Sequence, residues 1–325
     1  MKTLLITGGA GFIGSHLCLT LLKNKYSLYI IDSYINSSPE SLERVKFLSN
    51  ASEEYIEKNL KIFCGDLRDK KTIHKLFLNA KDIGRPIDGV IHLAGLKSVS
   101  ESINSPSIYW DNNVIATRNL LDVMIKNECY TIVFSSSASI YETNSKILNE
   151  NTNIKAMHPY ANTKIVIEKL LHDAFFSEPS KWRVACLRYF NPIGAHTSGL
   201  IGEDPLGVPN NIFPRIIKVA SGEIRNLTVF GNDWSTPDGS GVRDFIHVMD
   251  LAEGHLSALD YLLEGQPKLI NINLGTGKGT SVLELIEIFE NVNDVKIPYI
   301  FSKRREGDAS EVVADNSLAM HLINF

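Results

Sequence analysis

The chain has 325 residues, of which 44% are hydrophobic and 22% are charged, as is usual for a soluble globular protein. Its formal net charge of −4 offers no positive field for nucleic acid. No apolar run approaches the ~20 residues of a transmembrane helix, and the apolar run after Met1-Lys2-Thr3 is too short for a signal peptide. We therefore expect a cytoplasmic protein that has neither nucleic-acid nor membrane partners.

The four cysteines, Cys18, Cys64, Cys129 and Cys186, are scattered along the chain and form no CxxC pair. This pattern is not that of a disulfide-rich secreted protein. We expect buried free thiols in a reducing compartment, and we expect no metal site.

Residues 2–7 form a short apolar run that ends in a glycine cluster with glycines at positions 8, 11 and 14. Residues 15–22 then carry apolar side chains at helical spacing. A strand, a glycine turn and a helix in this order are the context of a dinucleotide-binding loop, because glycine lets the backbone approach a pyrophosphate at a helix N-terminus. A plain turn between a strand and a helix is the alternative interpretation.

The next apolar run, residues 27–31, ends in Asp32. An acidic residue at the tip of the second strand can accept a hydrogen bond from a ribose 2′-hydroxyl and would repel a 2′-phosphate. The position of Asp32 therefore favours NAD over NADP.

Apolar runs and helical patterns alternate along the first 190 residues or so. We expect one exposed helix within residues 36–59, strands at 60–63, 89–93, 130–134 and 183–189, and helices at 69–78 and 114–126. A further strand at 270–274 is expected to return to the same sheet. This alternation predicts an α/β fold, a Rossmann-type doubly wound parallel sheet. The domain division that we expect is 1–190 for the dinucleotide and 191–325 for a smaller, mixed α/β substrate domain interlocked with the first.

Tyr160 and Lys164 follow His158-Pro159 and start a helix, since proline is well accommodated in a first turn. Four residues apart, the two side chains share one helical face. A lysine ammonium beside a phenol favours the phenolate, which can act as a base. An ordinary surface helix is the alternative. The hydroxyls of Ser135, Ser136 and Ser137 end the preceding strand and are expected to lie near Tyr160.

Together, the glycine loop, the serines and the Tyr160-x-x-x-Lys164 pair resemble the extended short-chain dehydrogenase/reductases. Later motifs resemble one family among them, the UDP-hexose 4-epimerases. These motifs include Arg188-Tyr189-Phe190-Asn191-Pro192, Gly202-Glu203-Asp204-Pro205, Phe230-Gly231-Asn232-Asp233, Gly241-Val242-Arg243-Asp244 and Arg304-Arg305-Glu306-Gly307-Asp308.

The resemblance implies a tightly bound NAD that is regenerated in each cycle. The cofactor contacts that it implies are Gly8, Gly11, Phe12, Ile13, Gly14, Asp32, Asn36, Ser37, Asp66, Leu67, Leu93, Ala94, Gly95, Lys97, Asn113, Ser137, Tyr160, Lys164 and Phe190.

It also implies catalysis by Tyr160, Lys164 and Ser137, with Tyr160 taking the proton of the sugar 4-hydroxyl and Lys164 lowering the Tyr160 pKa. The product is the C4 epimer of a UDP-hexose, formed through a 4-keto sugar. The substrate contacts that it implies are Ser137, Tyr160, Asn191, Asn211, Ile212, Thr228, Val229, Phe230, Arg243, Arg305, Asp308 and Val312.

Val312 stands where the best-known bacterial member of the family has tyrosine. A smaller residue there is associated with room for N-acetylhexosamines, so UDP-GlcNAc and UDP-GalNAc are candidate substrates beside UDP-glucose and UDP-galactose. The family also suggests a homodimer formed through helices near residues 107–126 and 159–176. The chain ends at Phe325, earlier than typical members, which carry a further helical tail.

Two other functions share parts of this pattern. A sugar-nucleotide 4,6-dehydratase has the same fold and Tyr/Lys pair but needs an acid and a base directly after the active-site hydroxyl. Those positions hold Ala138 and Ser139, which disfavours the dehydratase. A non-catalytic NAD-binding regulator would have little reason to keep Tyr160, Lys164 and both arginines together.

Overall fold

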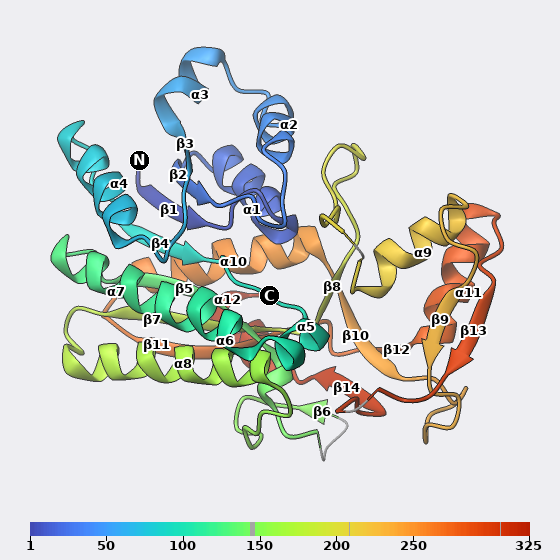
Figure 1. Cartoon of the computed structure of the whole chain (residues 1–325). Helices are drawn as coiled ribbons and strands as arrows, with labels where there is room; N and C mark the ends of the chain where they lie inside the picture. The colour runs from blue at the N-terminus through green and yellow to red at the C-terminus, as the bar shows by residue number, and fades with distance from the viewer. Residues whose placement is uncertain (144–146, 208, 306) are drawn as a thin grey trace.

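The computed structural model of the chain describes residues 1–143, 147–207, 209–305 and 307–325. Among these residues, seven strands form a parallel sheet in the order β11-β7-β5-β4-β1-β2-β3 (Figure 1). The strands are β1 (Thr3–Thr7), β2 (Ser27–Asp32), β3 (Leu60–Cys64), β4 (Gly89–His92), β5 (Thr131–Ser137), β7 (Arg183–Tyr189) and β11 (Leu269–Leu274). β11 pairs with β7 in parallel, so the chain returns to this sheet after a long excursion.

The helices are α1 (Phe12–Lys23), α2 (Glu40–Leu48), α3 (Glu53–Asn59), α4 (Lys70–Asp82), α5 (Val99–Asn104), α6 (Pro106–Tyr109), η1 (Trp110–Ile115), α7 (Ala116–Lys126), η2 (Ala138–Ile140), α8 (Pro159–Ser177), α9 (Ile212–Ala220), α10 (Val248–Leu263), α11 (Val282–Asn293) and α12 (Ser317–Ile323). Here η1 is a π-helical turn and η2 a 3₁₀ turn.

Helices cover both faces of the large sheet. Leu4 and Ile6 of β1 belong to a core that includes α1, α2, α10 and α12, whereas Leu5 belongs to a second core with α4, α7 and α8. Successive residues of a strand point to opposite faces, and all three side chains are fully buried. A sheet that is buried on both sides needs apolar residues throughout, which is why its strands read as continuous apolar runs. The predicted doubly wound α/β fold is confirmed.

The single exposed helix expected within residues 36–59 is wrong, because two helices, α2 and α3, lie there. Asn50 has a left-handed backbone with φ of 52° and interrupts the first helix. The hydroxyl of Ser52 then accepts a hydrogen bond from the backbone N–H of Tyr55 at 3.2 Å and starts the second. Serine is a strong N-cap residue, so a new helix begins there.

The second half of the chain contributes β8 (Asn191–Ile193), β9 (Leu227–Phe230), β10 (Val242–His247), β12 (Gly279–Ser281), β13 (Tyr299–Ser302) and β14 (Glu311–Ala314). β10 pairs with β8, β12 and β14, and β14 also pairs with the short β6 (Ile147–Leu148). β9 pairs with β13 and packs with α9 and α11 around a small core of its own. Figure 1 shows these last elements as a lobe on the right of the view.

The cysteines are all free, and Cys18, Cys129 and Cys186 are buried as expected. The expectation is wrong for Cys64, which is exposed because it ends β3, at the edge of the sheet. Among the described residues, we find no helix with the length and apolar character needed to cross a membrane.

Candidate active site

The glycine loop joins β1 to α1 and is closed by its own backbone. Gly8 has φ of 71° and donates its N–H to the carbonyl of Ile31 at 2.9 Å. A Cβ on Gly14 would lie 2.2 Å from the Gly8 carbonyl oxygen, and a Cβ on Gly8 would lie 2.8 Å from the backbone nitrogen of Ala94. The loop therefore admits only glycine at both positions, and it brings the tips of β1 and β4 together beside the N-terminus of α1, a favourable place for an anion.

Asp32 ends β2 and is 8% exposed. One carboxylate oxygen accepts the N–H of Ala10 at 2.9 Å, and the other accepts the N–H of Tyr34 and the hydroxyl of Ser37, each at 2.9 Å. Asp32 thus fixes the glycine loop and the loop after β2. A carboxylate has about four lone-pair positions, so this one keeps the capacity to accept a further hydroxyl.

The other residues expected to contact the cofactor lie mainly after β3, β4 and β7. Asp66 forms an ion pair with Arg68, in which both Nε and Nη2 of Arg68 donate to Asp66 and the distance from Nη2 to Oδ2 is 2.6 Å. This ion pair holds the Asp66 pKa below its usual value. Leu67 and Phe190 are buried, whereas Asn36, Gly95 and Lys97 are exposed. Phe12 and Ile13 open α1 and are half-buried, as are Leu93 and Ala94 after β4.

Asn113 is 1% exposed and lies in the π-helical turn η1. Its amide accepts the N–H of Leu96 at 2.8 Å and donates to the Leu96 carbonyl and to the hydroxyl of Thr163, each at 3.0 Å. All of these bonds are within the protein. Asn113 therefore clamps the loop after β4 to α8, the helix that carries Tyr160.

Tyr160, Lys164 and Ser137 lie together where β5 ends and α8 begins. Lys164 is 5% exposed, and its Nζ donates to the carbonyl of Ser135 at 2.6 Å and lies 5.8 Å from the centre of the Tyr160 ring. Burial lowers the pKa of Lys164 to about 8, although the charge of Glu168 raises it. The spacing of four residues thus places both side chains at the tip of β5.

The lowering of the Tyr160 pKa that we expect from Lys164 is not seen in this structure. Burial raises the pKa of Tyr160 to about 12, and the Ser137 hydroxyl opposes the rise only partly. The physical reason is that Lys164 turns its ammonium to a backbone carbonyl and to the Phe134 ring, 4.7 Å away, and does not compensate the desolvated phenol.

His158 is a site residue that the spacing of motifs did not identify. It is the N-cap of α8, where its Nδ1 accepts the N–H of Ala161 at 3.1 Å, and its ring stacks on Tyr160 with 5.9 Å between centroids. Burial lowers the His158 pKa, whereas the charge of Asp308 raises it. The charge of Asp308, from the second half of the chain, therefore acts on the ring that stacks on Tyr160. An aromatic residue two positions before the tyrosine is the signal that could have found it.

Arg243, Arg305, Asp308 and Phe230 form one cluster. Arg305 Nε donates to Asp308 at 2.9 Å, and the Arg305 guanidinium lies 4.8 Å from the centre of the Phe230 ring. Desolvation lowers the pKa of Arg243, the nearby Asp308 raises it and Arg305 lowers it. Two guanidinium groups thus face a common region, which suits a diphosphate.

The remaining expected substrate contacts lie on or beside β8, β9, β14 and α9, in the second half of the chain. Val312 pairs with Arg243 across β14 and β10 and packs against the small core formed by Ala138, Phe190 and others. Asn191 and Ile212 are half-buried, Thr228 is half-buried on β9, and Val229 points into the core at 1% exposed. The Val229 side chain packs inside the lobe, and a contact of this residue with the substrate stays a prediction.

Glu203 connects the two groups of expected ligand contacts. One of its carboxylate oxygens accepts from Lys97 at 3.0 Å and from Asn211 at 2.6 Å. Its other oxygen is buried and has no hydrogen-bond partner among the described residues. Lys97 follows β4, whereas Asn211 precedes α9, so one carboxylate links a residue expected at the cofactor to one expected at the substrate.

Known proteins resemble the chain over nearly its whole length. The family model described as the NAD dependent epimerase/dehydratase family matches residues 4–275. A UDP-glucose 4-epimerase 2 of Arabidopsis thaliana is 47% identical over 325 residues, covering 100% of this chain and 90% of that protein.

Solved structures agree with this match. The UDP-glucose-4-epimerase of Stenotrophomonas maltophila, with bound NAD and formylated UDP-arabinopyranose, has a TM-score of 0.93 at 40% identity and covers 100% of this chain and 93% of its own. The enzyme of Bifidobacterium longum, in complex with NAD+ and UDP, has a TM-score of 0.91 at 42% identity with the same coverage. The chain belongs to the NAD dependent epimerase/dehydratase family.

Proposed function

We propose that the chain is an NAD-dependent isomerase that interconverts UDP-glucose and UDP-galactose by epimerisation at C4. The observation that carries this proposal is the meeting of two groups of residues. Tyr160, Lys164 and Ser137 lie at the tip of β5. In the second half of the chain, Asp308 pairs with Arg305, and its charge acts both on Arg243 and on His158, whose ring stacks on Tyr160. A site that combines a base with arginines for a diphosphate is suited to a nucleotide sugar as substrate.

The residues present fit NAD. The glycine loop leaves no room for a Cβ at positions 8 and 14, it lies beside the N-terminus of α1, and Asp32 at the tip of β2 can still accept a ribose hydroxyl. When bound, NAD supplies a hydride acceptor and, once reduced, a hydride donor. The residues that would hold it are those of the glycine loop, Asp32, the loop after β4 and Lys164.

Tyr160 acts as the base that takes the proton of the 4-hydroxyl and returns it when the keto group is reduced from the other face. Ser137, whose hydroxyl interacts with Tyr160, hydrogen-bonds the same sugar oxygen. Lys164 provides a positive charge that favours the phenolate once its ammonium turns from the Ser135 carbonyl. Arg243 and Arg305 bind the diphosphate and leave the sugar free to rotate, so that its other face can be reduced.

The test is to incubate the purified protein with UDP-galactose and no added NAD. UDP-glucose as product supports the proposal, because the cofactor is then carried by the protein and used without net consumption. A 4-keto-6-deoxy sugar would identify a dehydratase, and no reaction would favour a regulator. Ala138 is buried directly after Ser137, where a dehydratase needs a carboxylic acid, so we expect no elimination product.

A wider substrate range follows from Val312. Its small side chain lies across from Arg243 and next to the core around Ala138 and Phe190. We propose that UDP-GlcNAc and UDP-GalNAc are also interconverted. Val312→Tyr should then abolish turnover of the N-acetylated sugars and keep that of UDP-galactose. Wild-type protein without detectable UDP-GlcNAc turnover would refute this second proposal.

We also propose that the protein is a cytoplasmic homodimer. Exposed apolar side chains lie on α5, α6, η1, α7 and α8. In this group η1 contacts α6, α7 and α8, and α5 contacts α6 and α8. The exposed side chains are Ile103, Ile108, Trp110, Ile115, Ile125 and Phe176. Single exposed apolar residues are ordinary on a protein surface, but a group on adjoining helices suits an interface.

A further inference from the structure

Glu168 continues the helical face that carries the catalytic pair. It follows Lys164 by four residues on α8, so Tyr160, Lys164 and Glu168 lie above one another on successive turns. Glu168 is 4% exposed, and Arg188 of β7, its partner, is 2% exposed. Charged side chains are rarely buried so completely, and this pair is not among the residues assigned to ligands above.

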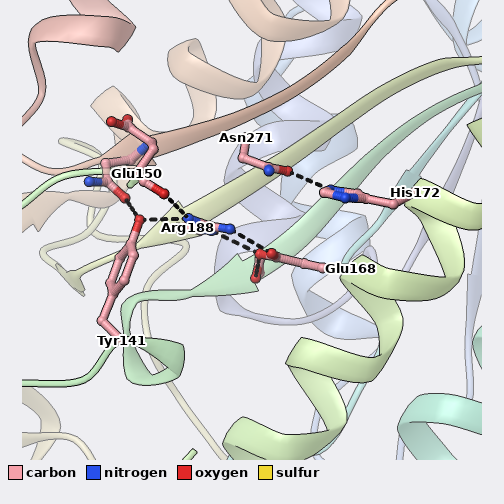
Figure 2. Close-up of polar contacts among 8 residues, drawn as sticks. Tyr141, Glu150, Glu168, His172, Arg188 and Asn271 are labelled. Carbon is pink, nitrogen blue, oxygen red and sulfur yellow. Dashed lines mark hydrogen bonds and ion pairs between the residues drawn. The ribbon is translucent and has the colours of Figure 1, made fainter. Parts of the chain in front are cut away.

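Both oxygens of the Glu168 carboxylate accept hydrogen bonds, and Figure 2 shows those that Arg188 donates. Arg188 donates to one oxygen at 3.0 Å and to the other at 2.7 Å, and the Ser136 hydroxyl donates to the first oxygen at 2.5 Å. Arg188 also donates to the Tyr141 hydroxyl at 2.9 Å and to the carbonyl of Glu150 at 3.1 Å. This bidentate geometry holds α8, β5 and β7 in one register.

The bond from Ser136 connects this pair to the catalytic site. Ser136 is flanked by Ser135, whose carbonyl accepts from Lys164, and by Ser137, whose hydroxyl interacts with Tyr160. A carboxylate that fixes Ser136 therefore fixes the backbone on which both catalytic partners depend. Displacing it would move both contacts together.

The charge of Glu168 acts on Lys164 as well. Besides Tyr160 and Glu168 on α8, His92 on β4 interacts with the charge of Lys164. Cys186 and Arg188 on β7 and Tyr141 after β5 interact with Glu168, and Tyr189 on β7 interacts with Tyr160. Burial keeps His92, Cys186, Tyr141 and Tyr189 neutral at pH 7. Glu168 is the carboxylate whose charge raises the Lys164 pKa, against the lowering by burial.

We propose that Glu168 is a positioning residue of the epimerisation, which keeps the tip of β5 in place and Lys164 in its ammonium form while touching neither substrate nor cofactor. The proposal rests on the proposed function, because Lys164 has a catalytic role only there. It assigns a catalytic purpose to an ion pair that packing alone does not require, since buried ion pairs are often replaceable by apolar residues without loss of stability.

The test compares Glu168→Gln, which removes the charge, with Glu168→Asp, which keeps it. Without the carboxylate charge, the ammonium form of Lys164 is less favoured, so Lys164 loses its proton at lower pH. We expect the alkaline limb of the kcat profile to move down by about 1 pH unit in Glu168→Gln. The KM for UDP-galactose should stay unchanged, because Arg243 and Arg305 are untouched. In Glu168→Asp the limb should stay at its wild-type position.

A second readout does not depend on turnover. In protein labelled at the ε carbon of lysine, the NMR signal that is missing in Lys164→Met belongs to Lys164, and its titration midpoint can be followed directly. The pH midpoint of the Lys164 titration should fall in Glu168→Gln by the same amount as the pH of the alkaline limb. In Glu168→Asp the midpoint should equal that of the wild type. Equal midpoints in wild type and Glu168→Gln would overturn the proposal, as would a midpoint in Glu168→Asp that falls as far as in Glu168→Gln.

A double variant covers the case in which Glu168→Gln does not fold because Arg188 is left without its counter-charge. Glu168→Gln combined with Arg188→Met removes both charges and leaves no unpaired ion. The Lys164 midpoint should again lie below that of the wild type, and an unchanged midpoint would contradict the proposal. Wild-type protein that fails to convert UDP-galactose would refute the proposed function instead, while the NMR midpoints would still decide the role of Glu168.

Discussion

Tyr160 is a neutral phenol at pH 7, because burial raises its pKa to about 12. Its hydroxyl becomes a base only when positive charge is brought to it, and the nearest candidate, Lys164, is bound to the Ser135 carbonyl in this structure. The positions of Tyr160 and Lys164 thus follow from helical spacing. The ionisation of the Tyr160 phenol depends on the groups that surround its ring.

Replacing Tyr160 by phenylalanine removes the acid–base group and keeps the ring that stacks on His158. We expect kcat for UDP-galactose to fall by at least ~100-fold, since general acid–base catalysis contributes about that much or more. Bound NAD, measured after denaturing the protein, should remain stoichiometric. Tyr130→Phe is the matched control, because Tyr130 packs on Trp182 away from the site. Full activity in Tyr160→Phe would refute the assignment.

Lys164 should set the upper pH limit of the reaction. Burial lowers its pKa to about 8, so the ammonium form is lost as the pH rises through that value, and with it the charge that favours the phenolate. We expect kcat to fall above about pH 8. In Lys164→Arg, whose guanidinium keeps its proton, activity is lower but should persist at higher pH. The pH profile of both proteins is the measurement, and a shared alkaline limb would contradict this role.

Helical spacing predicted that Tyr160 and Lys164 share one face of a helix, and the family resemblance added Ser137 and the arginines to the predicted site. Neither predicted the raised Tyr160 pKa or the stacked His158. The first depends on burial of the phenol, and the second on how the chain enters α8, and both follow only from the folded structure. The bonds of Asn113 and Ser37 to other parts of the protein were equally invisible, because their partners are fixed only by the folded loops.

In the loop between β1 and α1, Gly14 is required for a different reason from a glycine in a flexible linker. Gly14 sits where a Cβ would be 2.2 Å from the Gly8 carbonyl oxygen, whereas a Cβ on Gly11 would be at an ordinary 3.4 Å from the same atom. The close approach, and not the freedom of the backbone, makes glycine necessary at position 14.

Gly14→Ala should therefore destabilise the protein by about 1–3 kcal/mol, the usual cost of forcing a methyl group into a packed site. Gly11→Ala is the control, and its unfolding temperature in the absence of ligands should stay close to that of the wild type, since it has a negative φ and space for the methyl group. Thermal unfolding of the two variants measures the difference. Equal losses would show that the close approach at Gly14 is not the cause.

Elements of the large sheet could be predicted well because buried parallel strands leave a strong apolar signal. The region between β2 and β3 could not, because α2 and α3 are short and polar and their separation depends on a cap at Ser52. The exposure of Cys64 followed from the place of β3 at the sheet edge, which strand order decides and local sequence does not.

The apolar side chains on α5 to α8 provide a test for the whole molecule. Ile108→Asp together with Ile115→Asp places two charges on that surface, and we expect a monomer by size-exclusion chromatography with light scattering, with NAD still bound. Ile288→Asp on α11 is the control, since Ile288 is 48% exposed, much like Ile108 at 47%. A wild-type monomer, or a double variant that remains a dimer, would refute the proposed interface.

Glu203 has a consequence for how the two ligands communicate. Its carboxylate holds Lys97 and Asn211 at once, so a ligand that draws away either donor alters the charge balance felt by the other. Thermodynamic linkage then requires reciprocity: any factor by which the dinucleotide changes the affinity for the sugar nucleotide is the factor by which the sugar nucleotide changes the affinity for the dinucleotide. Glu203→Gln should weaken this mutual dependence in both directions equally, which a pair of calorimetric titrations, each with and without the other ligand, would reveal.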